Sequence, residues 1–409
     1  MLQLLAIILS VSAFFGYINH KWLKLPTTIG VMLIGVLMGI GLKFLEGISP
    51  GLVSPVRQFI TGFDFSDFVL GFILSFLLFA GSLHVKIADL KKTWASVISY
   101  ATLGTLISTF ALGACAYFVL QWFGLHLDFI VCLLFGALIS PTDPIAVIGI
   151  LSKYNIPKKL KVEIVGESLF NDGVGVVVFT TIYSIMQMGP GELTLVNVLK
   201  IFSLEVIGGI GIGILAGYIG YWLMRSIDHY QTEILISLAL VTGGYTVASS
   251  LHASGPLAMV VAGLIVGNKG KREAMSDITA DYVDKFWELV DEICNTVLFV
   301  LMGLEIFLVP FQMSYLLLGI LFIVISLAVR FISLVPGYLI FNRKEPSKIL
   351  GLSILTWGGL RGGISVSLAL SLRNSLPNGD LLLVLTFCIV LFSILVQGLS
   401  IKSLLKKYQ

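Results

Sequence analysis

The chain consists of long apolar runs separated by short polar segments, and most runs have the length of a membrane-spanning helix. Gly, Pro and charged residues mark the points where one run ends and the next begins. The connection at 45–65 is the longest loop predicted on one side, and 268–285, an amphipathic stretch, is the longest on the other. The pattern predicts thirteen helices, at 2–18, 27–43, 66–85, 94–121, 128–151, 161–187, 195–224, 233–250, 255–268, 285–309, 314–341, 349–371 and 381–403.

Composition places these helices in a membrane. Of the 409 residues, 57% are hydrophobic and 12% are charged, which is about half the charged fraction of a typical soluble domain. Such a chain cannot coat a globular surface, so a soluble enzyme, a disordered protein and a disulfide scaffold are excluded. We predict an all-α, multi-pass membrane protein whose residues 1–409 form one transmembrane domain without a soluble domain.

The Lys and Arg residues indicate how the predicted helices are oriented. If thirteen helices cross the membrane from an outside N-terminus, 20 of the 26 basic residues fall on the cytoplasmic side and 4 on the outer side. This bias is the positive-inside pattern of membrane proteins. The other two, Arg330 and Arg361, lie within predicted helices. The C-terminus is therefore expected to be cytoplasmic.

Two of the predicted helices contain a break near their middle. In the fifth helix, Ser140-Pro-Thr-Asp-Pro144 contains Pro141 and Pro144, each of which removes a backbone donor and clashes with the preceding turn. A simple proline kink is the alternative, but it does not account for Asp143 between the prolines. In the twelfth helix, four glycines weaken the helical geometry: Gly358, Gly359, Gly362 and Gly363.

The positions of the breaks predict an internal repeat. Helices five and twelve are seven apart, an odd number, so they would occupy equivalent places in two six-helix repeats of opposite topology. We predict repeats at 1–187 and 233–409, joined by a linker helix at 195–224. Paired broken helices that cross at the midplane are typical of a transporter's binding site. Arg361 can neutralise the negative helix ends there, a structural role that we favour over a ligand role.

The sixth helix contains the string Gly166-Glu-Ser-Leu-Phe-Asn-Asp-Gly173. Glu167 and Asn171 are four residues apart, and so are Ser168 and Asp172. The two pairs form adjacent stripes on the helix, so all four side chains are expected to face the same interior.

Oxygen atoms dominate the side chains gathered around the first break. Ser168 and Asp172 offer hydroxyl and carboxylate oxygens, and Thr142 and Asp143 offer the same pair of groups. Hard oxygen ligands without His or Cys suit a small hard cation. The alternative is that the two aspartates serve only as structural hydrogen-bond anchors.

Two further charges lie deep within predicted helices. Glu167 and Arg330 are expected to form a buried ion pair, because either charge alone in lipid would be costly. We interpret this pair as structural. Glu205 in the seventh helix has no predicted partner, and its role is left open.

The remaining motifs carry no chemistry of their own. The five histidines are scattered, the four cysteines form no metal or redox spacing, and no phosphate-binding loop is present, so ATP is not expected to drive the protein. Gly209, Gly213 and Gly217 recur every four residues, which is typical of a helix-packing face. The basic loops are interpreted as determinants of orientation and not as nucleic-acid sites.

These motifs together resemble the monovalent cation:proton antiporters, in the NhaP-like and sodium/proton exchanger branch. The string 166–173 is the specific part of the resemblance, and Thr142-Asp143, Arg330 and Gly359-Leu-Arg-Gly362 match in the same order. The family implies a thirteen-helix antiporter fold with a core domain and a dimerisation domain, usually in a homodimer. By matching motif, the resemblance implies that the cation- and proton-binding residues are Asp172, Asp143, Thr142 and Ser168, and that the supporting residues are Glu167, Asn171 and Arg330.

The expected function is antiport of Na⁺, or of Li⁺ or K⁺, for H⁺ in a prokaryotic inner membrane, without a cofactor. The order Asn171-Asp172 resembles the electroneutral branch, which implies 1:1 exchange. A K⁺/H⁺ antiporter and a cation channel are the alternatives, although one occluded cluster does not make a continuous pore. An organic-anion symporter would not gather carboxylates, and a membrane enzyme would need a nucleophile or metal cluster that the sequence lacks.

Overall fold

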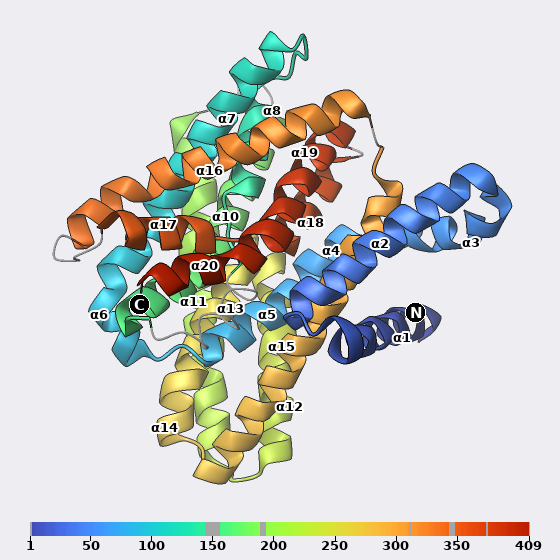
Figure 1. The fold of residues 1–409 in the computed structure, drawn as a ribbon. Coiled ribbons are helices and arrows are strands. Elements are labelled where there is room, and N and C mark those ends of the chain that lie inside the picture. The colour runs from blue at the N-terminus through green and yellow to red at the C-terminus, as the bar shows by residue number, and fades with distance from the viewer. Residues whose placement is uncertain are drawn as a thin grey trace.

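The computed structural model describes residues 2–143, 156–188, 194–310, 312–342, 348–373 and 375–408 of the chain. These residues form helices joined by short connections, together with one isolated antiparallel bridge between Asp143 and Leu360. Figure 1 shows α10 (Lys158–Gln187) near the centre of the molecule, with other helices on several sides of it. The prediction of an all-α protein is confirmed for the described part of the chain.

The helical segments are given with their bounds, where η denotes a segment of π or 3-10 geometry. The first half contains α1 (Leu2–Ile18), η1 (Asn19–Leu23), α2 (Thr27–Ile48), α3 (Pro50–Thr61), α4 (Phe65–Asp67), η2 (Phe68–Ile73), α5 (Leu74–Leu83), α6 (Ile87–Ser99), η3 (Tyr100–Gly104), α7 (Thr105–Trp122), α8 (Phe129–Ile139) and α10. The second half contains α11 (Leu195–Arg225), α12 (Tyr230–Ser250), α13 (Gly255–Ile265), η4 (Val266–Gly270), α14 (Lys271–Glu273), α15 (Asp277–Glu305), η5 (Ile306–Leu308), α16 (Met313–Phe341), α17 (Lys348–Gly358), α18 (Gly363–Arg373), α19 (Gly379–Leu391), η6 (Phe392–Gln397) and α20 (Gly398–Tyr408).

Eight helical segments among the described residues are long and apolar enough to cross a membrane, as expected for a multi-pass membrane protein. Three shorter apolar helices, α8, α17 and α18, adjoin the two breaks. The fourth and tenth predicted helices begin earlier than expected, at Ile87 and Asp277. Much of the predicted inner loop at 268–285 is therefore helical.

A helix occupies the connection at 45–65 that the pattern predicts to be a loop. Pro50 occupies the first turn of α3, where its missing N–H costs no hydrogen bond. Val53 and Ile60 are buried on one side of α3, while Leu52 is exposed. The prediction of a loop is wrong, because an amphipathic helix needs only one apolar face and can be shorter than a membrane span.

The two predicted breaks are present, and their main chains cross. α8 ends at Ile139 and the next four residues are not helical, whereas α17 ends at Gly358 and α18 begins at Gly363. The N–H of Asp143 donates to the Leu360 carbonyl oxygen at 2.7 Å. Pro144 and the rest of the predicted fifth helix, as far as 151, lie outside the described residues.

Close approach explains two glycines of the second break. A Cβ atom on Gly362 would lie 2.6 Å from Oδ2 of Asp143, and one on Gly359 would lie 2.7 Å from Nη2 of Arg330. Both distances are below 3.0 Å, which real Cβ contacts essentially never reach. Glycine is therefore a packing requirement of the crossing, in addition to weakening the helix as the sequence indicates.

The helices form two groups that meet beside the breaks. We call the helices within 87–188 and 313–408 the core group, and those within 2–83 and 195–305 the panel group. In the core group α7 packs on α8 and α16 on α19, and in the panel group α2 packs on α15 and α11 on α13. The groups meet where α10 contacts α13 and where α18 contacts α4. In Figure 1 the panel helices α12, α14 and α15 project downward beyond the core.

Polar contacts identify the two faces of the bundle on which the helices end. On the face that we call the basic face, Lys158 pairs with Asp89 at 2.7 Å, and Lys271 donates to the main chain at the end of α5. On the opposite face, Arg373 at the end of α18 pairs with Asp380 at 2.8 Å. The breaks lie between these two faces.

Candidate functional site

One side of α10 carries four polar side chains against the first break. Glu167, Ser168, Asn171 and Asp172 are all buried, and their spacing places them on adjacent stripes of the helix. Burial of polar groups is costly unless each group has a partner. The partners of these four side chains differ, and this difference divides the site into a paired part and an open part.

Asn171 is at the centre of the paired part. Its Nδ2 donates to the Thr142 hydroxyl at 2.8 Å and to Oε1 of Glu167 at 2.9 Å. Its Oδ1 accepts the main-chain N–H of Thr142 at 3.2 Å, and the hydroxyl oxygens of Thr142 and Ser168 lie 3.1 Å apart. The break is therefore tied to α10 by main-chain and side-chain hydrogen bonds, which hold two of the predicted ligand oxygens side by side.

Arg330 of α16 closes the other end of this network. Its Nη1 lies 2.7 Å from Oε1 of Glu167, and its Nη2 donates to Oε2 at 2.7 Å, so the ion pair expected from the sequence is bidentate. Both side chains are 2% exposed. Removal of one partner from such a buried pair lowers the free energy of unfolding by roughly 3–5 kcal/mol. Glu167 is therefore in an environment that contributes to stability.

Arg361 neutralises the end of α8. Its Nη1 donates to the carbonyl oxygens of Ser140 at 2.7 Å and Pro141 at 3.0 Å, which follow directly after α8. The C-terminal end of a helix carries partial negative charge, so a guanidinium at this place is stabilising. The contacts agree with the structural interpretation of Arg361, and none of them involves Asp172.

Asp172 is the open part of the site. It is 8% exposed, and its carboxylate accepts no hydrogen bond from any residue that the structure describes. It lines a cavity of about 520 Å³ between the core and panel groups. Asp143 from the break lines the same cavity, which we call the central cavity, and Lys161 and His84 line it nearer the basic face.

The structure brings the four predicted ligand residues together in two pairs, one buried beside α10 and one on the cavity wall. Thr142 contacts Ser168, while Asp143 and Asp172 share the cavity wall. Among the described residues, no three His, Cys, Asp or Glu side chains are close enough together to hold a metal ion.

Two carboxylates of the panel group also line the central cavity, and the sequence does not assign them to the site. They are Glu288 and Asp291 of α15, which share the lining of the cavity with Asp172 and Asp143. Their spacing of three residues places them on one side of the helix, but both lie near the start of the predicted helix 285–309, so the sequence does not place them at the midplane. Packing of α15 beside α5 brings them to the site.

Glu205, whose partner the sequence leaves open, lies in a different cavity. Its Oε2 accepts the Thr180 hydroxyl at 2.6 Å. The two residues line a space of about 460 Å³ together with His252, and neither Asp172 nor Asp143 lines it. Glu205 is therefore not part of the central site.

Crossed helix breaks, a hydrogen-bonded polar network and an open carboxylate on a cavity within a multi-pass helical bundle define a secondary ion transporter. The chain belongs to the transmembrane sodium/hydrogen exchanger family, whose pattern matches residues 10–407. This is a family of transporters.

Named relatives match the chain over nearly its full length. The chain is similar to the Na⁺/H⁺ antiporter NhaP of Pseudomonas aeruginosa, with 46% identity over 100% of this chain and 97% of that protein. It is 34% identical to the Na⁺/H⁺ antiporter NhaH of Halobacillus dabanensis, over 99% of this chain and 96% of that protein. The fold matches the sodium proton antiporter MjNhaP1 of Methanocaldococcus jannaschii with a TM-score of 0.77 at 21% identity, covering 98% of this chain and 97% of that one.

Proposed function

We propose that this protein exchanges Na⁺ for H⁺ across a membrane and that Asp172 holds each ion in turn. One observation carries the proposal: Asp172 faces the central cavity without a hydrogen-bond donor among the described residues, while Glu167, one turn away, is fully engaged by Arg330. The names of the relatives, which are Na⁺/H⁺ antiporters, support the choice of ions.

Competition for one negative charge provides the exchange. The carboxylate of Asp172 is neutralised once, either by a proton or by a cation that it helps to coordinate, so the two ions exclude each other. The Thr142 and Ser168 hydroxyls and Asp143 supply further oxygens for a partly dehydrated Na⁺. If only the neutralised site moves between the two faces, each Na⁺ carried one way requires a proton carried the other way.

The neutral side chain of Asn171 favours 1:1 stoichiometry. Its amide is committed to Thr142 and Glu167, so it adds no charge that a second ion would have to balance. We therefore propose electroneutral exchange. An imposed membrane potential should then leave the equilibrium Na⁺ gradient unchanged, which can be measured in proteoliposomes clamped with K⁺ and valinomycin.

The placement of the protein in the membrane is part of the proposal. The distribution of Lys and Arg supports a basic face on the cytoplasmic side of a prokaryotic cell membrane. The N-terminus would then lie outside the cell and the C-terminus in the cytoplasm. We also propose a single transmembrane domain with inverted repeats at 1–187 and 233–409, a linker helix at 195–224, and assembly as a homodimer in the bilayer.

The deciding experiment is transport by purified protein in proteoliposomes that contain a pH-sensitive dye. We expect Na⁺ to move protons in the wild type and not in the Asp172→Asn variant, with Li⁺ and K⁺ scanned in the same assay. Asp89→Asn is the matched control, because it makes the same chemical change at the basic face, away from the cavity. Wild-type exchange by a folded Asp172→Asn protein would refute the assignment.

A further inference from the structure

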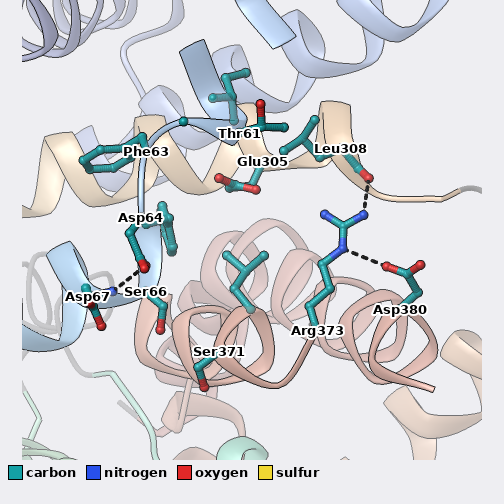
Figure 2. Close-up of a pocket in the computed structure, with 14 residues that line it drawn as sticks. Thr61, Phe63, Asp64, Ser66, Asp67, Glu305, Leu308, Ser371, Arg373 and Asp380 are labelled. Atoms are coloured by element: carbon teal, nitrogen blue, oxygen red, sulfur yellow. Dashed lines mark hydrogen bonds and ion pairs between the residues drawn. The ribbon is translucent and has the colours of Figure 1, made fainter. Parts of the chain in front are cut away.

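A second cavity lies between the core and panel groups on the face opposite the basic face (Figure 2). Its volume is about 750 Å³, and its lining comes from the end of α3, the α3–α4 connection and α4, and from α15, η5, α18 and α19. We call it the outer pocket, because the orientation proposed above places this face outside the cell. The charged residues that line it are four acids and one base, Asp64, Asp67, Glu305, Asp380 and Arg373.

Glu305 is the residue that distinguishes the outer pocket from an ordinary acidic surface. It is 4% exposed, and Figure 2 shows its carboxylate in the space between α15 and α18. None of the described residues forms a hydrogen bond or an ion pair with it. A buried carboxylate without a bonded partner is costly unless it takes up a proton or a cation, so Glu305 marks a place in the pocket where positive charge is stabilised.

The nearby basic side chains, Arg373 and Lys43, do not form an ion pair with Glu305. Arg373 uses Nε for Asp380, at 2.8 Å, and Nη2 for the Leu308 carbonyl oxygen, at 3.2 Å. Lys43 of α2 donates to the Val309 carbonyl oxygen and does not line the pocket. The guanidinium is therefore bonded to Asp380 and to the main chain, and it attracts the charge of Glu305 only through space, without an ion pair.

Helix ends add to the negative potential of the outer pocket. α15 continues after Glu305 as the 3-10 segment η5, which ends at Leu308, and α18 ends at Arg373, so both segments direct their C-terminal carbonyl groups toward this face. The partial negative charge of a helix C-terminus favours a cation within its last turn. This contribution is independent of the acidic side chains.

We infer that the outer pocket is a second binding site, in which Glu305 and Asp64 hold a partly hydrated monovalent cation. The described residues contain no cluster of three carboxylates, His or Cys that could chelate a metal, so the pocket is not built for a tightly held divalent ion. The identity of the cation as Na⁺ rests on the proposed function, whereas the existence of the site rests on the pocket alone.

Packing beneath the outer pocket separates it from Asp172. The Ser66 hydroxyl of α4 donates to the Ser367 carbonyl oxygen of α18 at 2.9 Å, and this contact is buried. Deeper in the bundle, Leu298 of α15 packs directly on Gly363. A cation at Glu305 is therefore bound at a site separate from the central site. It passes between the two sites when these contacts open.

The test places a reporter thiol in the pocket, at the exposed Ser371. In Ser371→Cys protein, a cationic methanethiosulfonate reagent should react faster than an anionic one of similar size, and Na⁺ should slow the cationic reagent at constant ionic strength. Adding Glu305→Gln should lower the ratio of the two rates about fivefold and abolish protection by Na⁺. Since Asp64 is exposed, Asp64→Asn provides a second variant that is expected to fold and to lower the ratio by a smaller factor.

Two further variants, each made in the Ser371→Cys protein, separate this site from the proposed transport site. Glu46→Gln removes a carboxylate that pairs with Arg57 on the same face outside the pocket, and it should change neither rate. Asp172→Asn should abolish exchange and leave the protection of the reporter thiol by Na⁺ intact. Protection that survives Glu305→Gln, or that disappears in Asp172→Asn, would overturn the inference. Exchange that persists in Asp172→Asn would refute the proposed function alone.

Discussion

Two carboxylates on α10, five residues apart, have opposite environments. Glu167 and Asp172 are both buried, but Glu167 receives two bonds from Arg330 and one from Asn171, whereas Asp172 receives none from the described residues. One is sealed within the core group, and the other lies on the wall of a cavity. Burial alone therefore does not distinguish these two acids, and the presence or absence of a protein partner is the basis on which we propose Asp172 as the functional one.

The largest effect is expected at Asp172. Asp172→Asn should eliminate exchange and leave the melting temperature unchanged or raised, because it removes a buried charge that no described residue stabilises. Proton flux in proteoliposomes and fluorescence-detected melting of the same preparation measure both properties. Glu167→Gln is the matched comparison and should lower the melting temperature, since it leaves the charge of Arg330 unpaired. If both variants melt alike, the contrast between the two carboxylates is wrong.

Arg330→Met should have the largest effect on stability. It leaves Glu167 buried without its counter-ion, at a cost of roughly 3–5 kcal/mol in the free energy of unfolding. Denaturant unfolding in detergent provides the measurement. Arg373→Met is the control, because the pair of Arg373 with Asp380 is partly exposed and should contribute no more than about 1 kcal/mol.

A smaller loss is expected at the crossing of the two breaks. Gly362→Ala introduces a methyl group into the space occupied by Asp143, which should destabilise the protein by about 1–3 kcal/mol and slow exchange. At Gly211 an added Cβ would meet nothing within 4 Å, so Gly211→Ala should be neutral or stabilising by up to about 1 kcal/mol. Equal stability losses in the two variants would show that the close approach at Gly362 has no energetic consequence.

The smallest effect concerns a single ligand oxygen. Ser168→Ala removes a hydroxyl beside Thr142 and keeps Asp172. We expect it to weaken the free energy of Na⁺ binding by about 1 kcal/mol. The Na⁺ concentration for half-maximal exchange should then rise about fivefold. Ser75→Ala removes a hydroxyl that bonds only within its own helix and should change this concentration little. An unaltered Na⁺ dependence in Ser168→Ala would remove Ser168 from the ligand set.

Most of the helices and the members of the polar network were predictable from local sequence. Apolar runs define the spans, because lipid penalises every exposed polar group. The spacing of Glu167 and Asn171 places them on one stripe, and the need to neutralise Glu167 predicts Arg330, although the two lie 163 residues apart in the chain.

The features that could not be predicted from the sequence depend mainly on packing between segments that are distant in the chain. The amphipathic helix α3 is too short to give the signal of a span. Asp291 and Glu305 of α15 appear in the sequence as charges near a helix end, and only the position of α15 between the two helix groups brings one to the central cavity and the other to the outer pocket. The reason for Gly362 is likewise invisible locally, because the atom it avoids belongs to Asp143.

The bridge between Asp143 and Leu360 has a consequence for how such proteins diverge. Its hydrogen bond joins two main chains, so side-chain substitutions along the breaks do not remove it, provided that the neighbouring position stays small. The main requirement of the crossing is therefore that residue 362 has no side chain, because this leaves room for Asp143. The overall fold is shared with a protein that is only 21% identical. We expect glycine at position 362 to be retained among relatives more often than most of the apolar residues around it.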